Sequence, residues 1–152
     1  MDPVVRSFLK ASLVWLSLGV TLGVAMGVHP AWTIYRPVHE HMNLLGFVSM
    51  MIFGVAYHVI PRFSGHPLWR RQVAIWHAWL ANAGLALMAI GFVVRVQSSV
   101  APLVGGALLG LGGCLSAIGA YLFAYNIWRT IDASVAVLDL RRAGGRAQAK
   151  SA

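Results

Sequence analysis

Residues 38–60 read VHEHMNLLGFVSMMIFGVAYHVI, and this stretch decides the fold class. A helix needs about 20 apolar residues to cross a hydrocarbon layer roughly 30 Å thick, and the stretch meets that length. Backbone groups in lipid must be hydrogen-bonded within their own segment, so the stretch is read as a helix rather than a strand. Its polar residues lie at its start, where they mark one end of a transmembrane helix.

Three further apolar stretches flank this one, and we expect transmembrane helices at residues 7–28, 38–60, 73–94 and 100–128. Of the 152 residues, 59% are hydrophobic and only 11% are charged, a balance that does not suit a water-soluble surface. Short connections make consecutive helices antiparallel neighbours. The sequence therefore predicts an all-α membrane protein: a four-helix antiparallel bundle over residues 1–143, with a cytoplasmic extension of the last helix up to residue 142 and a disordered tail at residues 144–152.

The net charge of +8 is explained by where the cations lie. Ten of the twelve fall on one side of the predicted bundle, and only Arg36 and Arg95 fall on the other. The ten are Arg6, Lys10, Arg62, Arg70, Arg71, Arg129, Arg141, Arg142, Arg146 and Lys150. Since cytoplasmic loops of membrane proteins are enriched in Lys and Arg, both termini are expected in the cytoplasm of a bacterial inner-membrane protein. The basic charge thus indicates orientation among membrane lipids, not a nucleic-acid partner.

Glycines at regular spacing on the first and last predicted helices indicate close helix packing. The first helix carries Gly19, Gly23 and Gly27, and the last carries Gly106 and Gly110 at one spacing and Gly105, Gly112 and Gly119 at another. Such faces pack either within one chain or between subunits. The spacing alone leaves both alternatives open.

Six histidines stand out in so apolar a chain, because ionisable groups in membrane helices tend to mark function. His39 and His41 open the second helix at its outer end and are the first candidates for a metal. His58 and His77 lie at the inner side and are secondary candidates. Seventeen residues separate His41 from His58, about 25 Å along a helix, so they cannot share one cofactor within a chain. For His29 and His66, simple hydration at helix ends is the better interpretation.

The spacing of His39 and His41 is informative. Two residues of a helix turn about 200°, so the two imidazoles point to nearly opposite flanks and cannot hold the same metal. They can serve two different sites, one on each side of the helix. Neutral imidazole binds iron, copper and zinc, so the residue type does not select the metal.

Residues 39–63, HEHMNLLGFVSMMIFGVAYHVIPRF, resemble the second transmembrane helix of catalytic subunit I of the haem-copper oxidases, especially the nitric oxide reductase branch. In that family a histidine, one further residue, Asn and Leu-Leu open the helix, and Tyr with Ile-Pro closes it. The resemblance implies that His41 is an axial ligand of a low-spin haem. The family takes its other haem and copper ligands from later helices. A complete oxygen- or nitric oxide-reducing centre in this chain is therefore not expected.

The resemblance also suggests an oligomer. The family's subunit is a pseudo-threefold arrangement of four-helix units, of which this chain resembles one third. A homotrimer, favoured here over a dimer, would rebuild that ring with each haem between His41 of one chain and His39 of the next. Arg36 and Arg95 are expected near the haem propionates, with helix ends at the lipid headgroups as the alternative. Asn43 is expected to orient an imidazole or to bond a neighbouring helix.

The function expected from this resemblance is that of a membrane b-type cytochrome, with haem b and possible copper, that receives electrons from a quinol or cytochrome donor. Bis-histidine ligation favours electron transfer, whereas an open position on iron favours a gas sensor. The alternative is a non-catalytic accessory or assembly component of a respiratory complex. Oxidoreductase activity would require an oligomer or partners, because the sequence offers no acid/base pair or activated nucleophile.

Overall fold

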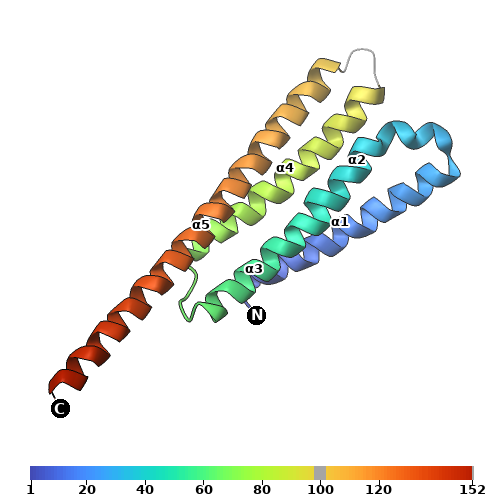
Figure 1. Ribbon diagram of the computed structural model, residues 1–152. Helices are drawn as coiled ribbons and strands as arrows, with labels where there is room; N and C mark the ends of the chain where they lie inside the picture. Colours follow the sequence, from blue (N-terminus) through green and yellow to red (C-terminus); the bar gives the residue numbers. More distant parts are fainter. Residues whose placement is uncertain (98–101, 152) are drawn as a thin grey trace.

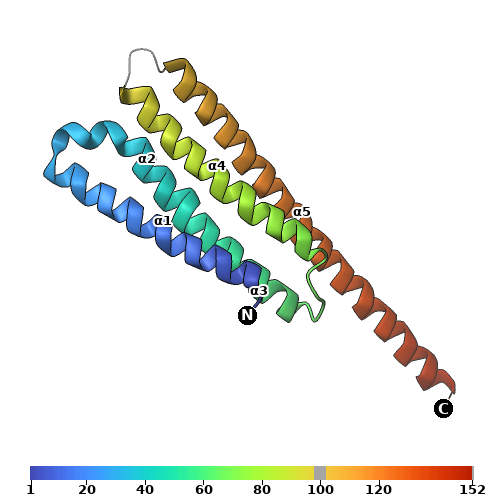
Figure 2. The same ribbon diagram turned by 180° about the vertical axis from the view of Figure 1, so that it is seen from behind.

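The computed structural model describes residues 1–97 and 102–151, and all four regions expected to cross the membrane are helical. Helix α1 spans Pro3–Val28, α4 spans Arg71–Gln97 and α5 spans Pro102–Ser151. The second crossing is helical from Pro30 to Phe63. Each crossing is long and apolar enough for a bilayer. Consecutive crossings run antiparallel, which confirms the predicted fold class (Figures 1 and 2).

The second crossing changes its winding along its length. A 3₁₀ turn, η1 (Pro30–Tyr35), leads into α2 (Arg36–His41), a π-helical segment η2 (Met42–Ser49) and finally α3 (Met50–Phe63). A π-helix is wound more widely than an α-helix, with backbone hydrogen bonds that span five residues instead of four. Within η2 the Ser49 hydroxyl also donates to the Leu44 carbonyl. Because π-helical turns occur frequently at functional sites, the place of η2 directly after His41 is notable.

Helix ends differ from the sequence prediction at several points. The α1 helix begins at Pro3 rather than at residue 7, and the second crossing is helical from Pro30 rather than from residue 38. Pro61 does not end the second crossing but lies inside the last turn of α3, which continues to Phe63. The α4 helix begins at Arg71 and ends at Gln97, a few residues beyond each expected end. The α5 helix continues through residues 144–151, where the sequence analysis expects disorder. Residues 146–150 are alanine, arginine, glutamine and lysine, which have high helix propensity, whereas Gly144 and Gly145 before them have low propensity.

The four crossings pack as two close pairs, α1 with the second crossing and α4 with α5 (Figure 1). In both pairs glycine residues, which lack a Cβ, allow the two helices to pack closely. A Cβ placed on Gly112 of α5 would lie 2.6 Å from the carbonyl oxygen of Gly84 in α4, and one placed on Gly23 of α1 would lie 2.7 Å from Cε1 of His39. Two of the predicted glycine faces therefore pack within the chain. They are the face of Gly105, Gly112 and Gly119 on α5 and the face of Gly19 and Gly23 on α1. For Gly27, Gly106 and Gly110, an added Cβ would meet no atom within 4 Å among residues 1–97 and 102–151.

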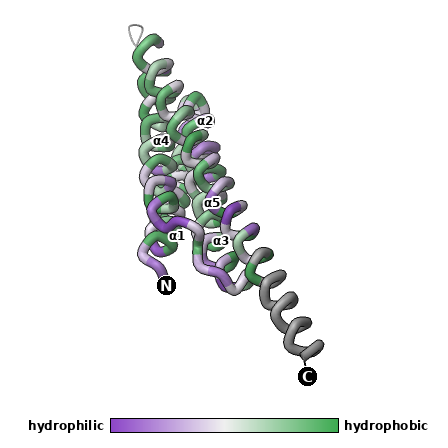
Figure 3. Tube along the Cα trace, turned by 90° about the vertical axis from the view of Figure 1, so that its left-hand side faces the viewer, coloured by the Kyte–Doolittle hydropathy of each residue, from purple (hydrophilic) through white to green (hydrophobic). Residues whose placement is uncertain are grey.

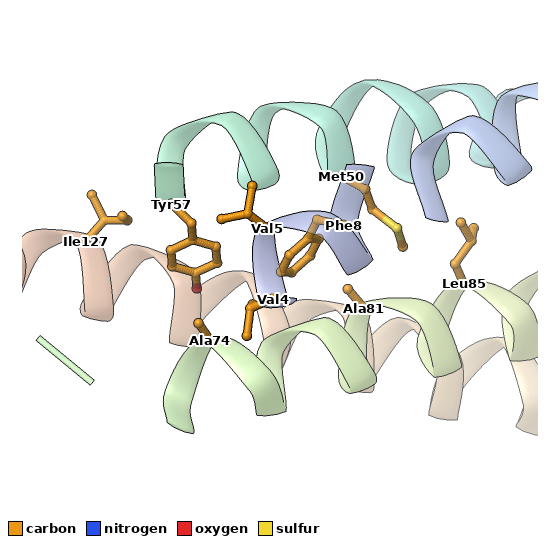
Figure 4. Close-up of a cluster of buried hydrophobic side chains, with 9 residues drawn as sticks. All are labelled: Val4, Val5, Phe8, Met50, Tyr57, Ala74, Ala81, Leu85 and Ile127. Carbon is orange, nitrogen blue, oxygen red and sulfur yellow. The ribbon is translucent and has the colours of Figure 1, made fainter. Parts of the chain in front are cut away.

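The buried core joins side chains of α1, α3, α4 and α5 (Figure 4), and its members Val4, Val5 and Phe8 belong to the N-terminal part of α1. Phe8 is fully buried, and its ring lies 5.8 Å from that of Tyr57 and 4.8 Å from that of His77. Toward lipid the surface is apolar, with large exposed side chains such as Trp79 and Ile118. Figure 3 shows hydrophobic residues over much of the bundle, as expected for a multi-pass membrane protein.

The inner connection between α3 and α4 is held against α5 by two buried polar side chains. The Asn126 amide accepts a bond from the Arg70 backbone N–H at 3.1 Å and donates to the Arg70 carbonyl at 3.0 Å. The Thr130 hydroxyl accepts from the Trp69 N–H at 3.0 Å. Both side chains are fully buried, so their hydrogen bonds tie this connection to α5.

Candidate functional site

His41 is the last residue of α2 and has the geometry of a prepared metal ligand. Its Nδ1 lies 2.8 Å from the carbonyl oxygen of Pro37, one turn earlier, so Nδ1–H donates to that oxygen and the lone pair is on Nε2. Its ring packs on Phe92 of α4, with centroids 5.0 Å apart. A backbone carbonyl on one ring nitrogen is what orients metal-binding histidines in other proteins. The half-buried His41 therefore offers Nε2 for a metal.

His39 has the same arrangement on a different flank. Its Nδ1 lies 2.8 Å from the carbonyl oxygen of Gly19 in α1, which again leaves the lone pair on Nε2. Its ring lies directly above Gly23. The imidazoles of His39 and His41 thus meet different neighbours, α1 and α4, as the helical turn of about 200° between them predicts.

Asn43 lies with His39 rather than with His41. Its amide nitrogen donates to the His39 carbonyl at 2.9 Å and also lies 3.4 Å from His39 Nε2, the ring nitrogen that carries the lone pair. It also sits above Gly19, where a Cβ would approach its amide nitrogen to 2.7 Å. Asn43 therefore contacts the imidazole of His39 and packs between α1 and η2, and its role toward a haem stays a prediction.

The two outer arginines lie at the same end of the bundle but in different surroundings. Arg36 forms an ion pair with Glu40, with Nε 2.7 Å from the carboxylate oxygen, and both side chains are substantially exposed. Arg95 is exposed on α4, and its Cβ lies against Gly105 of α5. Residues three apart share a helix face, so Arg95 lies one turn outward from Phe92, the residue that covers His41. Both guanidinium groups remain accessible to a carboxylate.

The inner histidines do not come together. His58 lies near the inner end of α3, where its Nε2 accepts a bond from Arg62 at 2.6 Å, and it lines a cavity with Tyr57. His77 is fully buried in α4 and lines a different, much smaller cavity of about 60 Å³. Ligand pockets usually measure roughly 300 Å³ or more, so a porphyrin does not fit beside His77.

The remaining two histidines lie at the surface. His29 is exposed between α1 and η1, with its ring 5.6 Å from that of Trp32. The Nδ1 of His66 lies 2.8 Å from the Pro67 carbonyl oxygen in the inner connection. No group of three or more His, Cys, Asp or Glu residues that could hold a metal ion gathers within the described part of the chain.

The donor set at the outer end fits haem iron better than a protein-enclosed zinc or copper. A structural zinc needs about four protein ligands, whereas a haem needs only one or two axial nitrogens from the protein. His41 and His39 each supply one such nitrogen, on opposite flanks of the same helix. A haem on either flank would need its second axial ligand from outside this helix.

Sequence reasoning did not find two groups that shape this site. The Pro37 carbonyl sits one helical turn before His41, a spacing that the sequence could have revealed. Phe92 lies 51 positions after His41, and no local pattern joins them. The pairing of Tyr57 with His77 at the inner side was also missed, because it depends on how α3 and α4 are aligned.

Comparison with known proteins adds to this geometry. Residues 3–146 match the family model described as cytochrome c and quinol oxidase polypeptide I. The chain is 28% identical to cytochrome c oxidase subunit 1 of Rhodobacter capsulatus, over 86% of this chain and 29% of that protein. It is 29% identical to the Cbb3-type cytochrome c oxidase subunit CcoN1 of Stutzerimonas stutzeri, over 88% of this chain and 34% of that protein. The chain therefore spans about a third of the length of these curated relatives.

Proposed function

Because the chain belongs to the family of cytochrome c and quinol oxidase polypeptide I, we propose that it is a b-type haem protein that transfers electrons in the respiratory chain of a bacterial inner membrane. The single observation that carries this proposal is His41. It stands at the histidine of the family motif, and its Nδ1 is bonded to the Pro37 carbonyl, so that Nε2 is left for iron.

The protein's own residues would hold and surround the haem. His41 Nε2 is the proposed axial ligand, and Phe92 fixes the plane of its imidazole from α4. Arg95 and Arg36 are accessible cations at the outer end, suited to bind haem propionates in bidentate fashion. Bound haem supplies a one-electron couple between ferrous and ferric iron. The donor would be a quinol or a cytochrome.

The first experiment tests the ligand. The protein is purified in detergent after expression with added haem precursor, and reduced-minus-oxidised spectra are recorded. We expect sharp haem b bands that are lost in His41→Ala and retained in the control His29→Ala, an exposed histidine of the same outer end. A colourless wild-type protein that binds copper would contradict the proposal and would favour an accessory or assembly role. Carbon monoxide binding by the reduced protein would indicate an open iron position and favour a gas sensor.

We propose further that the chain works as a homotrimer in which His39 of a neighbouring copy is the second axial ligand. Two observations support this. His39 Nε2 carries a lone pair on the flank of the helix opposite to His41, so one helix can serve two haems once the Asn43 amide, 3.4 Å from this nitrogen, turns away from it. The chain also covers about a third of its relatives' length, so three copies approach the size of one relative.

The subunit contact would use the small residues that the chain leaves open. A Cβ placed on Gly106 or Gly110 of α5 would meet no atom of the described residues within 4 Å, and small residues let membrane helices approach closely. We expect native mass spectrometry in lipid nanodiscs to show trimers of the wild type and monomers of Gly110→Leu. The control Gly27→Leu fills equally open space on α1 and should leave the trimer intact. A monomeric wild type that retains haem would contradict the shared-ligand model while leaving haem binding in place.

A further inference from the structure

His77 is fully buried, yet only one of its two ring nitrogens has a protein partner. Its Nδ1 lies 3.1 Å from the Tyr57 hydroxyl. Around the ring stand Phe8, Phe53 and Phe123, with centroids 4.8, 4.6 and 5.5 Å away. Among the described residues no group lies within hydrogen-bond distance of Nε2. A buried polar group without a partner costs about 1–3 kcal/mol, so Nε2 calls for a ligand that the protein itself does not supply.

A cavity of about 60 Å³ lies beside this ring, between η2, α3, α4 and α5. Its polar lining consists of His77 and the hydroxyls of Ser49 and Ser116. Ser49 donates to the Leu44 carbonyl and Ser116 to the Met88 sulfur, so both hydroxyl oxygens keep lone pairs that can accept. The volume exceeds the roughly 30 Å³ that a water molecule occupies in the liquid, and a buried water needs two to four polar partners.

We propose that this cavity, which opens partly to the bundle surface beside Leu45 and Ala120, is a water site. The water bonds to His77 Nε2 and to the hydroxyls of Ser49 and Ser116, and Tyr57 and His77 connect it to the cytoplasmic end of the bundle. Water satisfies Nε2 in either tautomer, because it both donates and accepts. The cavity is too small for a lipid, a quinone or a porphyrin. The site lies on the inner side and is separate from the proposed haem ligands at the outer end.

The connection rests on the position of Tyr57. This residue is buried, and it lines a second cavity of about 330 Å³ near the inner end of α3, together with the charged residues Asp2, Arg62 and Arg71. Its hydroxyl bonds to Nδ1 of His77, and His77 lines the water site. The two side chains therefore form a hydrogen-bonded bridge between the cytoplasmic-end cavity and the interior of the membrane domain.

The water site is tested by solid-state NMR of the full chain in lipid bilayers with ¹⁵N-labelled histidine. We expect magnetisation transfer from water to the His77 ring nitrogen, although the side chain is fully buried. The double variant Ser49→Ala/Ser116→Ala should lose that transfer, since two of the three polar partners are removed. The control Ser17→Ala, an exposed serine of α1, should retain it. Absence of transfer in the wild type, or its persistence in the double variant, would overturn the proposal, as would xenon binding in a dry cavity.

The connection is tested by deuterium exchange of the His77 ring proton. Tyr57→Phe keeps the ring in the aromatic core and removes only the hydroxyl, so exchange should become slower than in the wild type. Tyr121→Phe, whose ring is exposed on α5, should leave the rate unchanged. An unchanged rate in Tyr57→Phe would refute the connection through this pair.

Discussion

At the scale of single residues, the outer end of the bundle depends on which atoms each imidazole uses. His39 and His41 both bond a backbone carbonyl through Nδ1, so both present Nε2. What distinguishes them is the neighbouring helix, since His39 lies over glycines of α1 and His41 lies against Phe92 of α4. The position of the His39 ring therefore depends on the absence of a side chain at Gly23.

A first prediction follows for Gly23. In Gly23→Val the new Cβ would meet Cε1 of His39 at 2.7 Å, so the imidazole or α1 must move. Overpacking of this kind costs about 1–3 kcal/mol. We expect a lower thermal unfolding midpoint in detergent than for the wild type.

The matched control for this variant is Gly27→Val, one turn further along α1, where a Cβ meets no atom within 4 Å. It should unfold at the wild-type temperature. Equal midpoints for the two variants would show that His39 does not depend on the glycine contact.

The residue scale also shows the reach of sequence reasoning at the candidate site. Helical geometry alone predicts that His39 and His41 point to opposite flanks of the helix, and in the structure the two rings do have different neighbours. The contacts of Phe92 with His41 and of Tyr57 with His77 do not follow from it. They depend on the rotation of α3 and α4 about their axes, which packing in the folded bundle decides. The roles of these residues toward haem stay predictions.

At the scale of elements, the hydropathy of the sequence predicted all four crossings. The type of helical winding and the residues at which helices end could not be predicted from hydropathy and are known from the structure. The π-helical segment Met42–Ser49 has no simple sequence pattern, because its residues are as apolar as those of the α-helix that follows. Pro61 was expected to end a helix, but its missing N–H is tolerated within a crossing that ends only two residues later. Seven-residue glycine spacing did identify the face of α5 that packs on α4.

A second prediction concerns the inner connection before α4. Asn126→Leu removes both side-chain bonds to the Arg70 backbone, which leaves an N–H and a carbonyl without these partners. Each such loss costs about 1–3 kcal/mol when the groups are buried. The connection should loosen, and limited trypsin digestion in detergent should cleave faster after Arg70 and Arg71.

The control for this digestion is Tyr121→Leu on the exposed surface of α5, which should be cleaved at the wild-type rate. Were Asn126→Leu to resist trypsin as the wild type does, the two hydrogen bonds would not be what holds the connection.

At the scale of the whole molecule, the chain is a four-helix membrane protein of the oxidase subunit I family, as its sequence pattern indicated. The fold places the two sets of polar groups at different depths. The proposed haem ligands lie near the outer mouth of the second crossing, and the Tyr57–His77 pair lies toward the inner end, where the core is. The orientation of the chain in the membrane therefore decides which set of polar groups lies near the cytoplasm and which lies near the periplasm.

The last prediction tests that orientation. With ten cations on the side of both termini and two on the other, the positive-inside rule places both termini in the cytoplasm. A fluorescent protein that folds only in the cytoplasm should therefore fluoresce when fused after Ala152. Alkaline phosphatase, which is active only in the periplasm, should be active when fused after Gln97 at the outer end of α4 and inactive when fused after Gly65. The reverse pattern would place His41 on the cytoplasmic side and would exclude a periplasmic electron donor acting at that end.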